Sequence, residues 1–331
     1  MFFAFPDRIR VVKWSPQRHL LGAGGMSGQF LLYDPMRQMR LHIVGKSDDT
    51  SSFSLQNCSW LPSSTKKYVA LGSTSGYVEI WDVNAGKLLR SYVEHSPQVA
   101  SPSWYPYPDR KTICAVAWSP NRTYIASTGD DGEVRVWRAE TGATCCTMRL
   151  EAHYPSHLLA WLADNHTLVS SARDEIVVWD AFAGQVLCRI QTPCPYYYYD
   201  NQGCRAVSPD GKNVAIAAGS VVIYNLVTGA SVRSYHLPAD EDERSPSAPP
   251  GPFDLVSWSP NGKWLATTFS QRPRRIFVWD ARSGETLFRC KSHGDIWCLD
   301  WSFDSKLLAW GGDGYLETTA LSDPFVPSSH A

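Results

Sequence analysis

The chain has 331 residues and a formal net charge of −1, and its 19% of charged residues lies below the roughly 25% usual in soluble proteins. This composition excludes a global electrostatic field that would recruit nucleic acid or an anionic membrane. The sequence contains no run of about 18 apolar residues, and residues 1–7 lack the charged and apolar regions of a secretion signal. We expect an unsecreted, soluble, cytoplasmic protein, with the nucleus as the other compartment open to it.

Residues 113–142 and the few that follow predict four short antiparallel strands. Residues 113–118 form an apolar run that ends at a Ser-Pro-Asn turn, and residues 124–128 form the second strand. An Asp-Asp-Gly hairpin turn then leads to the third strand, residues 133–137, because glycine adopts positive φ without steric cost. Residues 143–150 supply the fourth strand. Such a meander leaves two edges unpaired, so one copy needs neighbours.

The same pattern recurs about every 40 to 60 residues, close to the roughly 40 to 45 residues of a four-stranded propeller blade. The first strand of each copy ends at a landmark, most often Trp-Ser-Pro, that begins at Trp14, Trp60, Trp118, Trp161, Val207, Trp258 and Trp301. The third strand most often ends in Trp-Asp, and the matching positions are Tyr33, Trp81, Trp137, Trp179, Tyr224, Trp279 and Thr319. In these motifs the sequence resembles the WD-repeat family of β-propellers over essentially its whole length. The resemblance implies an all-β fold, a seven-bladed β-propeller of four-stranded antiparallel blades.

One ring over residues 1–331 follows from this resemblance, because repeats of one unit stack on their neighbours. The expected blades lie near 8–48, 53–95, 111–152, 156–192, 202–236, 252–292 and 294–322. The last blade is short of one strand, since prolines disfavour a central strand after residue 322. In this family an N-terminal segment usually completes the last blade, here residues 1–5, which removes two exposed sheet edges. A frayed hydrophobic start is the alternative.

Long insertions leave blades two, four and five, and another interrupts blade six between its second and third strands. By the family's topology all of these loops lie on one face of the disc, which we call the loop-rich face. Because function on a rigid scaffold usually lies on variable loops, we expect binding there. The expected contact residues are Trp104, Tyr105, Tyr107, Tyr196, Tyr197, Tyr198, Tyr199, Arg272, Arg274, Arg275 and Trp297. For the loop aromatics the alternative is a lid folded back over the face.

An acidic run precedes blade six, and a cluster of arginines lies in the inserted loop of that blade. The charged residues are Asp240, Glu241, Asp242 and Glu243, with Arg272, Arg274 and Arg275 opposite them. We expect a weak latch between them, for which an acidic or phosphorylated partner would compete. Two independently solvated loops are the alternative.

Residues with catalytic potential are better explained by structure. The family's hydrogen-bonded set, in which a buried imidazole and carboxylate hold a loop to a third strand, is matched by His95, Ser127, Asp131 and Trp137. An Asp-His-Ser set also suggests a hydrolase, but no nucleophile-elbow motif accompanies it. Two pairs have metal-ligand spacing without a third ligand nearby, namely His153 with His157 and Cys290 with His293. We expect no metal, no cofactor and mostly buried, structural cysteines.

Side chains near the start of each first strand are expected to line a narrow central channel, among them Arg10, His157, Asp254 and Trp297. Our prediction is a non-enzymatic interaction scaffold, a monomeric ring within a larger complex. It docks a protein or peptide, acidic or phosphorylated, on the loop-rich face, without nucleic-acid or membrane partners. The alternative is an enzyme or small-molecule binder at the channel mouth, with His157, Asp254 or Arg10 as acid, base or charge clamp.

Overall fold

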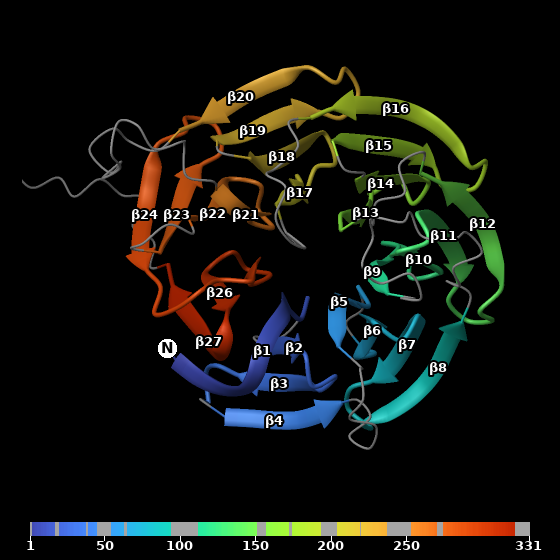
Figure 1. The fold of residues 1–331 in the computed structure, drawn as a ribbon, viewed down its shortest axis with the longest axis horizontal. Helices are drawn as coiled ribbons and strands as arrows, with labels where there is room; N and C mark the ends of the chain where they lie inside the picture. The colour runs from blue at the N-terminus through green and yellow to red at the C-terminus, as the bar shows by residue number, and fades with distance from the viewer. Residues whose placement is uncertain are drawn as a thin grey trace, which may run out of the picture.

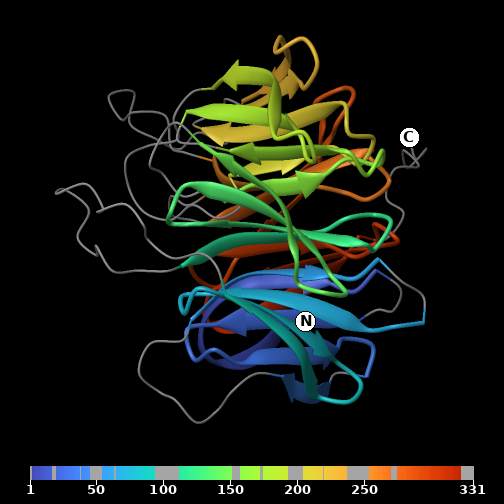
Figure 2. The same cartoon turned by 90° about the vertical axis from the view of Figure 1, so that its right-hand side faces the viewer.

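The computed structural model describes residues 2–16, 20–37, 39–44, 54–62, 65–93, 112–150, 157–171, 174–192, 204–218, 220–236, 253–269 and 274–321. Within these ranges the regular structure consists of the strands β1 to β27. The strands form blade-like sheets arranged around a central axis (Figures 1 and 2). The chain is an all-β propeller built from four-stranded antiparallel blades, as the sequence predicted.

The innermost strands are β1 (Phe2–Trp14), β5 (Leu55–Trp60), β9 (Ile113–Trp118), β13 (Leu159–Trp161), β17 (Arg205–Val207), β21 (Phe253–Trp258) and β25 (Cys298–Trp301). The second strands are β2 (Leu21–Gly25), β6 (Tyr68–Ser73), β10 (Tyr124–Gly129), β14 (Thr167–Ser171), β18 (Asn213–Ala218), β22 (Trp264–Phe269) and β26 (Leu307–Gly311). The third strands are β3 (Phe30–Asp34), β7 (Tyr77–Asp82), β11 (Glu133–Arg138), β15 (Glu175–Asp180), β19 (Ser220–Asn225), β23 (Arg275–Asp280) and β27 (Asp313–Ala320). The outer strands are β4 (Met39–Val44), β8 (Lys87–Val93), β12 (Thr144–Arg149), β16 (Gln185–Gln191), β20 (Ser231–Tyr235) and β24 (Thr286–Lys291).

The strands form six sheets, five of four strands and one of seven strands in the order β25-β26-β27-β1-β2-β3-β4. The seven-stranded sheet arises because β1 has two partners. Phe2 lies opposite Glu317 of β27, whereas Trp14 lies opposite Leu21 of β2. The expectation of seven separate blades is therefore corrected to six sheets, since one continuous strand joins the first and last copies of the repeat. The N-terminal segment pairs with the third strand of the last copy.

The Asp of the Trp-Asp landmark explains where each fourth strand begins. Asp280 Oδ1 accepts hydrogen bonds from the backbone N–H groups of Arg282 at 2.8 Å and Ser283 at 2.6 Å, which reverses the chain between β23 and β24. The same pair of bonds is made by Asp34, Asp82, Asp180 and Asn225. The backbone hydrogen bond from Ser283 is the main reason that the pKa of Asp280 lies below its ordinary value.

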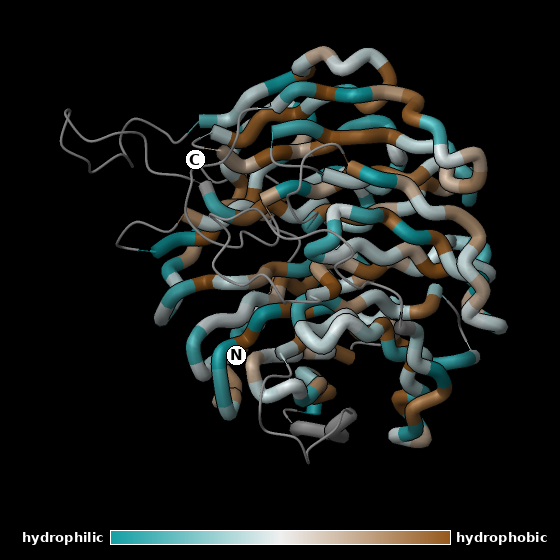
Figure 3. Tube along the Cα trace, turned by 45° about the vertical axis from the view of Figure 1, so that its right-hand side comes forward, coloured by the Kyte–Doolittle hydropathy of each residue, from teal (hydrophilic) through white to brown (hydrophobic). Residues whose placement is uncertain are grey.

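The Trp at the end of an inner strand joins neighbouring copies of the repeat. Trp60 Nε1 donates to the carbonyl oxygen of Lys13 at 3.1 Å. Equivalent bonds join Trp161 to Ala117, Trp258 to Ala206 and Trp301 to Ser257. Apolar clusters are shared in the same way, and apolar segments run along strands throughout the ring (Figure 3). Each copy thus completes its core with side chains from the next, so an isolated copy would not fold.

The structure also describes two further features, the state of the cysteines and the absence of long apolar helices in the described ranges. All eight described cysteines are free, and four of them, Cys58, Cys114, Cys204 and Cys298, are buried. Among the described residues no helix is long and apolar enough to cross a membrane.

Candidate functional site

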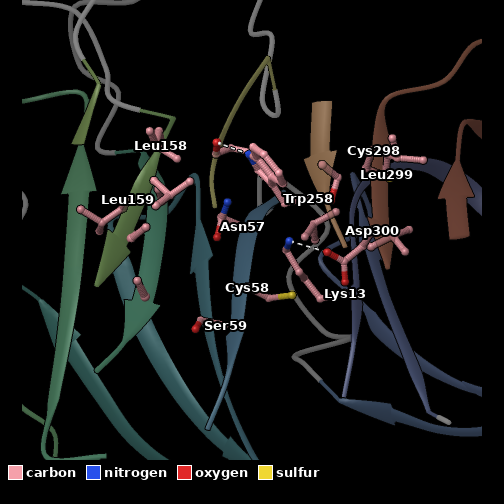
Figure 4. Close-up of a pocket in the computed structure, with 18 of the residues that line it drawn as sticks. Lys13, Asn57, Cys58, Ser59, Leu158, Leu159, Trp258, Cys298, Leu299 and Asp300 are labelled. Atoms are coloured by element: carbon pink, nitrogen blue, oxygen red, sulfur yellow. Dashed lines mark hydrogen bonds and ion pairs between the residues drawn. The ribbon is translucent and has the colours of Figure 1, made fainter. Parts of the chain in front are cut away.

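A cavity of about 510 Å³ lies at the centre of the ring, and residues of all the innermost strands line it. Figure 4 shows part of its wall. The lining includes charged or titratable side chains of Arg10, Lys13, Cys58, His157, Arg205, Cys298 and Asp300. Of the residues expected to line a central channel, Arg10 and His157 are part of this wall, whereas Asp254 and Trp297 are not. We call this cavity the central channel.

An ion pair crosses the channel wall between β1 and β25. Lys13 Nζ lies 2.8 Å from Asp300 Oδ1 (Figure 4). The other carboxylate oxygen accepts the backbone N–H of Trp14 at 2.8 Å. The Lys13 side chain is 41% exposed and that of Asp300 is 15% exposed, so water in the channel screens the pair. Burial by itself lowers the pKa of Lys13. The charge of Asp300 and the hydrogen bond to it have a larger, opposite effect, so the pKa of Lys13 is raised above its ordinary value. The amine is therefore an ammonium at neutral pH, which does not act as a base or nucleophile.

Two thiols lie in the same wall. Burial raises the pKa of Cys58 and of Cys298, so both are protonated at neutral pH. Since the thiolate is the reactive form of cysteine, neither thiol is prepared for nucleophilic attack. The polar groups of this wall fit a structural role better than a catalytic one.

One end of the channel carries positive charge. His157 lies before β13 and Arg205 at the start of β17, whereas Arg10 lies where the part of β1 that pairs with β2 begins. The connections from the outer strands enter at this end, which we call the channel mouth. The half-buried Arg10 side chain has its Nε buried, and no residue that the structure describes supplies an acceptor for it. It also forms no ion pair with any residue in the described ranges. Arg205 donates to Cys204 Sγ at 3.5 Å.

A second charged group surrounds the junction of β1 and β27, and we call it the closure corner. Asp313 Oδ1 accepts from Trp297 Nε1 at 3.0 Å and lies 2.6 Å from Arg8 Nε. The Arg8 guanidinium carbon lies 4.9 Å from the centre of the half-buried Trp297 ring. Arg274 forms an ion pair with Asp295. The expected contact residues Arg274 and Trp297 therefore already have partners within the chain, Asp295 and Asp313.

Other expected residues fall outside the described part of the chain. These are Trp104, Tyr105, Tyr107, Tyr196, Tyr197, Tyr198, Tyr199 and Arg272, together with the acidic residues 240–243. Arg275 is described, is half-buried, and lies opposite Lys291 in the β23–β24 pair. The acidic latch thus stays a prediction, and the carboxylate that Arg274 contacts is that of Asp295.

Of the residues that suggested a hydrolase, Ser127 lies in the core. Trp137 Nε1 donates to Ser127 Oγ at 2.7 Å, and both side chains are buried. Asp131 Oδ1 accepts the backbone N–H of Glu133 at 3.0 Å, while His95 lies outside the described residues. Trp179 with Ser170 and Trp279 with Thr267 repeat the indole–hydroxyl bond at 2.8 Å. A buried Ser127 hydroxyl that accepts from an indole is a structural group, since a catalytic serine must reach a substrate.

In the described ranges no three His, Cys, Asp or Glu side chains are grouped so as to hold a metal ion. The ring of His293 instead makes a hydrogen bond of 2.6 Å between Nδ1 and Glu317 Oε1. Burial raises the pKa of Cys290 to about 12, so its thiol is a poor metal ligand at neutral pH. His153 lies outside the described residues.

The repeated blades, the indole–hydroxyl bonds and the Asp turns define a WD-type β-propeller. The family described as "WD domain, G-beta repeat" matches residues 86–138 and 284–316. These matches support a place for the chain in the WD-repeat family.

Three curated relatives illustrate the similarity. The chain is 27% identical over 232 residues to "Protein hir1" of Aspergillus terreus, covering 66% of this chain and 21% of that protein. It is 25% identical over 221 residues to "Cell division cycle 20.6, cofactor of APC complex" of Arabidopsis thaliana, covering 64% of this chain and 46% of that protein. It is 34% identical over 122 residues to "Transducin beta-like protein 3" of Bos taurus, covering 35% of this chain and 13% of that protein. The chain thus spans less than half the length of each of these relatives.

Proposed function

We propose that the protein is a non-enzymatic scaffold that docks a protein or peptide on the loop-rich face, with an acidic or phosphorylated group of the partner at the channel mouth. The observation that carries this proposal is Arg10, whose guanidinium Nε is buried without an acceptor in the channel wall. Leaving a buried donor without an acceptor costs about 1–3 kcal/mol, and more for a charged group. A carboxylate or phosphate supplies that acceptor, since guanidinium binds both bidentately.

Further observations support binding over catalysis. The raised pKa of Cys58 and Cys298 and the ion-paired state of Lys13 disfavour nucleophilic chemistry in the channel. One relative is named as a cofactor of a complex, which supports a role in an assembly. We propose that this chain likewise acts as a monomeric ring within a larger cytoplasmic complex.

We also infer that the seven-stranded sheet acts as two blades that share β1, which gives the ring seven structural units. The supporting observation is that β1, β5, β9, β13, β17, β21 and β25 all contribute to the channel wall. In this arrangement seven rigid inner strands surround the central channel. A partner on the loop-rich face would therefore contact the Arg10 charge at the channel mouth, on a rigid strand, and the variable loops around it.

The test is affinity capture with the full chain, compared with Arg10→Glu and with a deletion of residues 96–111. We expect the wild type to capture a partner that Arg10→Glu loses at unchanged melting temperature. The matched control is Arg282→Glu, because Arg282 is exposed in the β23–β24 turn on the opposite face. Phosphatase treatment of the partner separates a phosphate from a carboxylate. Identical capture by the wild type and Arg10→Glu would overturn docking at the mouth.

A further inference from the structure

A second cavity, of about 630 Å³, lies between the β5–β8 sheet and the β9–β12 sheet. Its wall comes from the β5–β6, β9–β10 and β11–β12 turns and from β7 and β8. These turns lie at the ends of the inner strands away from the channel mouth, so this cavity opens on the face opposite the proposed docking face. We call it the inter-blade cavity. Its volume lies within the roughly 300–1,000 Å³ of typical ligand pockets.

The apolar part of the cavity is formed by side chains that also belong to the core. Leu61, Ile80 and Trp118 are buried, and Tyr68 is half-buried beside them. Leu89 of β8 is 38% exposed, which is unusual for a large apolar side chain next to a core. A bulky apolar group in the cavity would contact these side chains and cover Leu89.

Trp118 and Trp14 differ from the other tryptophans that end an inner strand, because their indole N–H groups are buried without an acceptor in the described ranges. In Trp60, Trp161, Trp258 and Trp301 this group donates to a backbone carbonyl of the preceding copy. The Trp118 Nε1 is buried and has no acceptor, because its copy is joined to the preceding one differently. There the backbone N–H of Trp118 donates to the Ser59 hydroxyl at 3.0 Å. Trp118, which lines the cavity, therefore carries a hydrogen-bond donor that no residue in the described part of the chain uses.

The rim of the cavity is mainly basic. Three cationic side chains line it, Lys66, Arg90 and Arg122, against one acidic side chain, Glu140. The Lys66 ammonium lies 5.8 Å from the centre of the Tyr68 ring. Arg90 and Arg122 are exposed, and neither forms an ion pair with a residue of the described ranges. This charge excess favours a ligand that carries carboxylates.

The walls are held in place independently of any ligand. The Tyr92 hydroxyl of β8 donates to the carbonyl oxygen of Ala139 at 2.5 Å, and its ring stacks on Trp137 at 5.6 Å. Gly142, at φ +77°, lies so close that an added Cβ would be 2.6 Å from the Tyr92 ring. The cavity is thus preformed, which reduces the entropy that binding must overcome.

An equivalent junction elsewhere in the ring provides an internal comparison. Between the β17–β20 and β21–β24 sheets, the Tyr235 hydroxyl donates to Ala281 at 2.8 Å, as Tyr92 does to Ala139. There, however, the Trp258 indole N–H is bonded to Ala206. Glycine also stands where the first junction has Arg122, since Gly262 at φ 70° corresponds to Arg122 at φ 67°. The unused donor and the extra cation therefore distinguish the inter-blade cavity from this second junction.

We propose that the inter-blade cavity binds a short peptide segment of a partner protein in which a bulky apolar side chain is flanked by acidic residues. The apolar side chain packs on Leu61, Ile80 and Trp118, and the carboxylates bind Arg90 and Arg122. A backbone carbonyl of the peptide accepts the Trp118 indole N–H. This site is separate from the channel mouth, so it stands or fails independently of the proposed function.

The test is fluorescence anisotropy with the full chain and labelled peptides in which one leucine or phenylalanine is flanked by glutamates. The same peptides with glutamine in place of glutamate measure the charge contribution. We expect the glutamate peptides to bind about tenfold or more tightly than the glutamine peptides and to weaken as salt is raised. We expect Arg90→Glu combined with Arg122→Glu to reduce affinity by a similar factor.

Two matched variants separate this site from general electrostatics. Arg233 stands two residues before Tyr235, as Arg90 stands two residues before Tyr92, so Arg233→Glu should leave binding unchanged. Trp118→Phe removes the unused N–H together with part of a buried ring, so it should weaken the peptide severalfold and lower the melting temperature less than Trp258→Phe does. Trp258→Phe, which removes a bonded N–H, should lower the melting temperature and leave peptide binding unchanged.

Several results would overturn the proposal. One is equal affinity for glutamate and glutamine peptides, and another is full binding by the Arg90→Glu, Arg122→Glu variant. A single-stranded oligonucleotide that binds as tightly and displaces the peptide would show a general anion surface instead. Failure of every peptide to bind the folded chain would exclude this class of ligand.

Discussion

Lys13 and Asp300, separated by 287 positions in the chain, form an ion pair with 2.8 Å between Nζ and Oδ1. Each directly precedes a Trp landmark, Trp14 in one case and Trp301 in the other. The same carboxylate accepts the Trp14 backbone N–H, so Asp300 joins β25 to β1 through both a side chain and the main chain. This contact acts in parallel with the strand pairing of β1 and β27.

We expect Asp300→Ala to lower the free energy of unfolding by about 1–3 kcal/mol, since it leaves the Trp14 N–H without its acceptor and Lys13 without its counter-charge. Asp300→Asn retains an acceptor oxygen and should cost less than Asp300→Ala. Urea unfolding at neutral pH measures both. Equal stability of the two variants and the wild type would show that the contact contributes nothing.

The charge part of this contact has a defined pH dependence. The folded-state pKa of Lys13 is raised above its ordinary value of 10.5, so the stabilisation is fully present below pH 10.5 and is lost as pH rises through the folded-state pKa. Lys13→Met should therefore be less stable than the wild type at neutral pH, with the difference shrinking above pH 10.5. Urea unfolding of both proteins across this range tests it, and a constant difference would contradict it.

Ser127→Ala should destabilise the ring by about 1–3 kcal/mol, because the buried Trp137 indole loses the Ser127 hydroxyl as acceptor. Trp137→Phe should cost less in the Ser127→Ala background than in the wild type, since the hydrogen bond is already absent there and only the loss of buried ring area remains. A double-mutant cycle by urea unfolding measures the coupling. Strictly additive effects of the two substitutions would mean that the bond contributes no coupling energy.

Asp280→Ala should cost about 1 kcal/mol, because the turn before β24 loses two hydrogen bonds to a carboxylate. Asp280→Asn should be nearly neutral at pH 7, since Asn225 makes the same two bonds in its own turn. The folded-state pKa of Asp280 is lowered, so its contribution is present above the ordinary pKa of 3.8 and is lost as pH falls through the folded-state value. Unfolding measured at pH 7 and near pH 3 should show Asp280→Asn losing less stability than the wild type on acidification.

The sequence predicted the strands well because their signals are local. Residues 113–118 were expected as a strand and are β9, and the Trp-Asp landmark marks the Asp turn that starts each outer strand. The sheet count was wrong, because no local signal shows that β1 continues from one blade into the next. The Lys13–Asp300 pair was not predicted from the sequence, although the sequence contains an indication of it. Residues of opposite charge directly precede the Trp landmarks of the first and last copies, and these two copies are neighbours in a closed ring. No sequence pattern indicated that the Trp118 indole N–H would lack an acceptor, since this depends on the contact between the Trp118 backbone and the Ser59 side chain of another copy.

Removal of residues 1–5 should destabilise the protein by several kcal/mol. The deletion takes away the strand opposite Leu316 and Glu317 and removes Phe5, which is 5% exposed and packs in the cluster of β1, β2 and β26. Phe5→Ala alone should cost about 3–5 kcal/mol, the usual value for truncating a buried phenylalanine. Phe2→Ala is the matched control, because Phe2 is 55% exposed and its loss should change stability little. Thermal and urea unfolding of the three variants measure these effects, and the truncated chain should also self-associate, since its β27 edge is unpaired. A truncated chain that melts with the wild type as a monomer would show that β1 does not hold the ring closed.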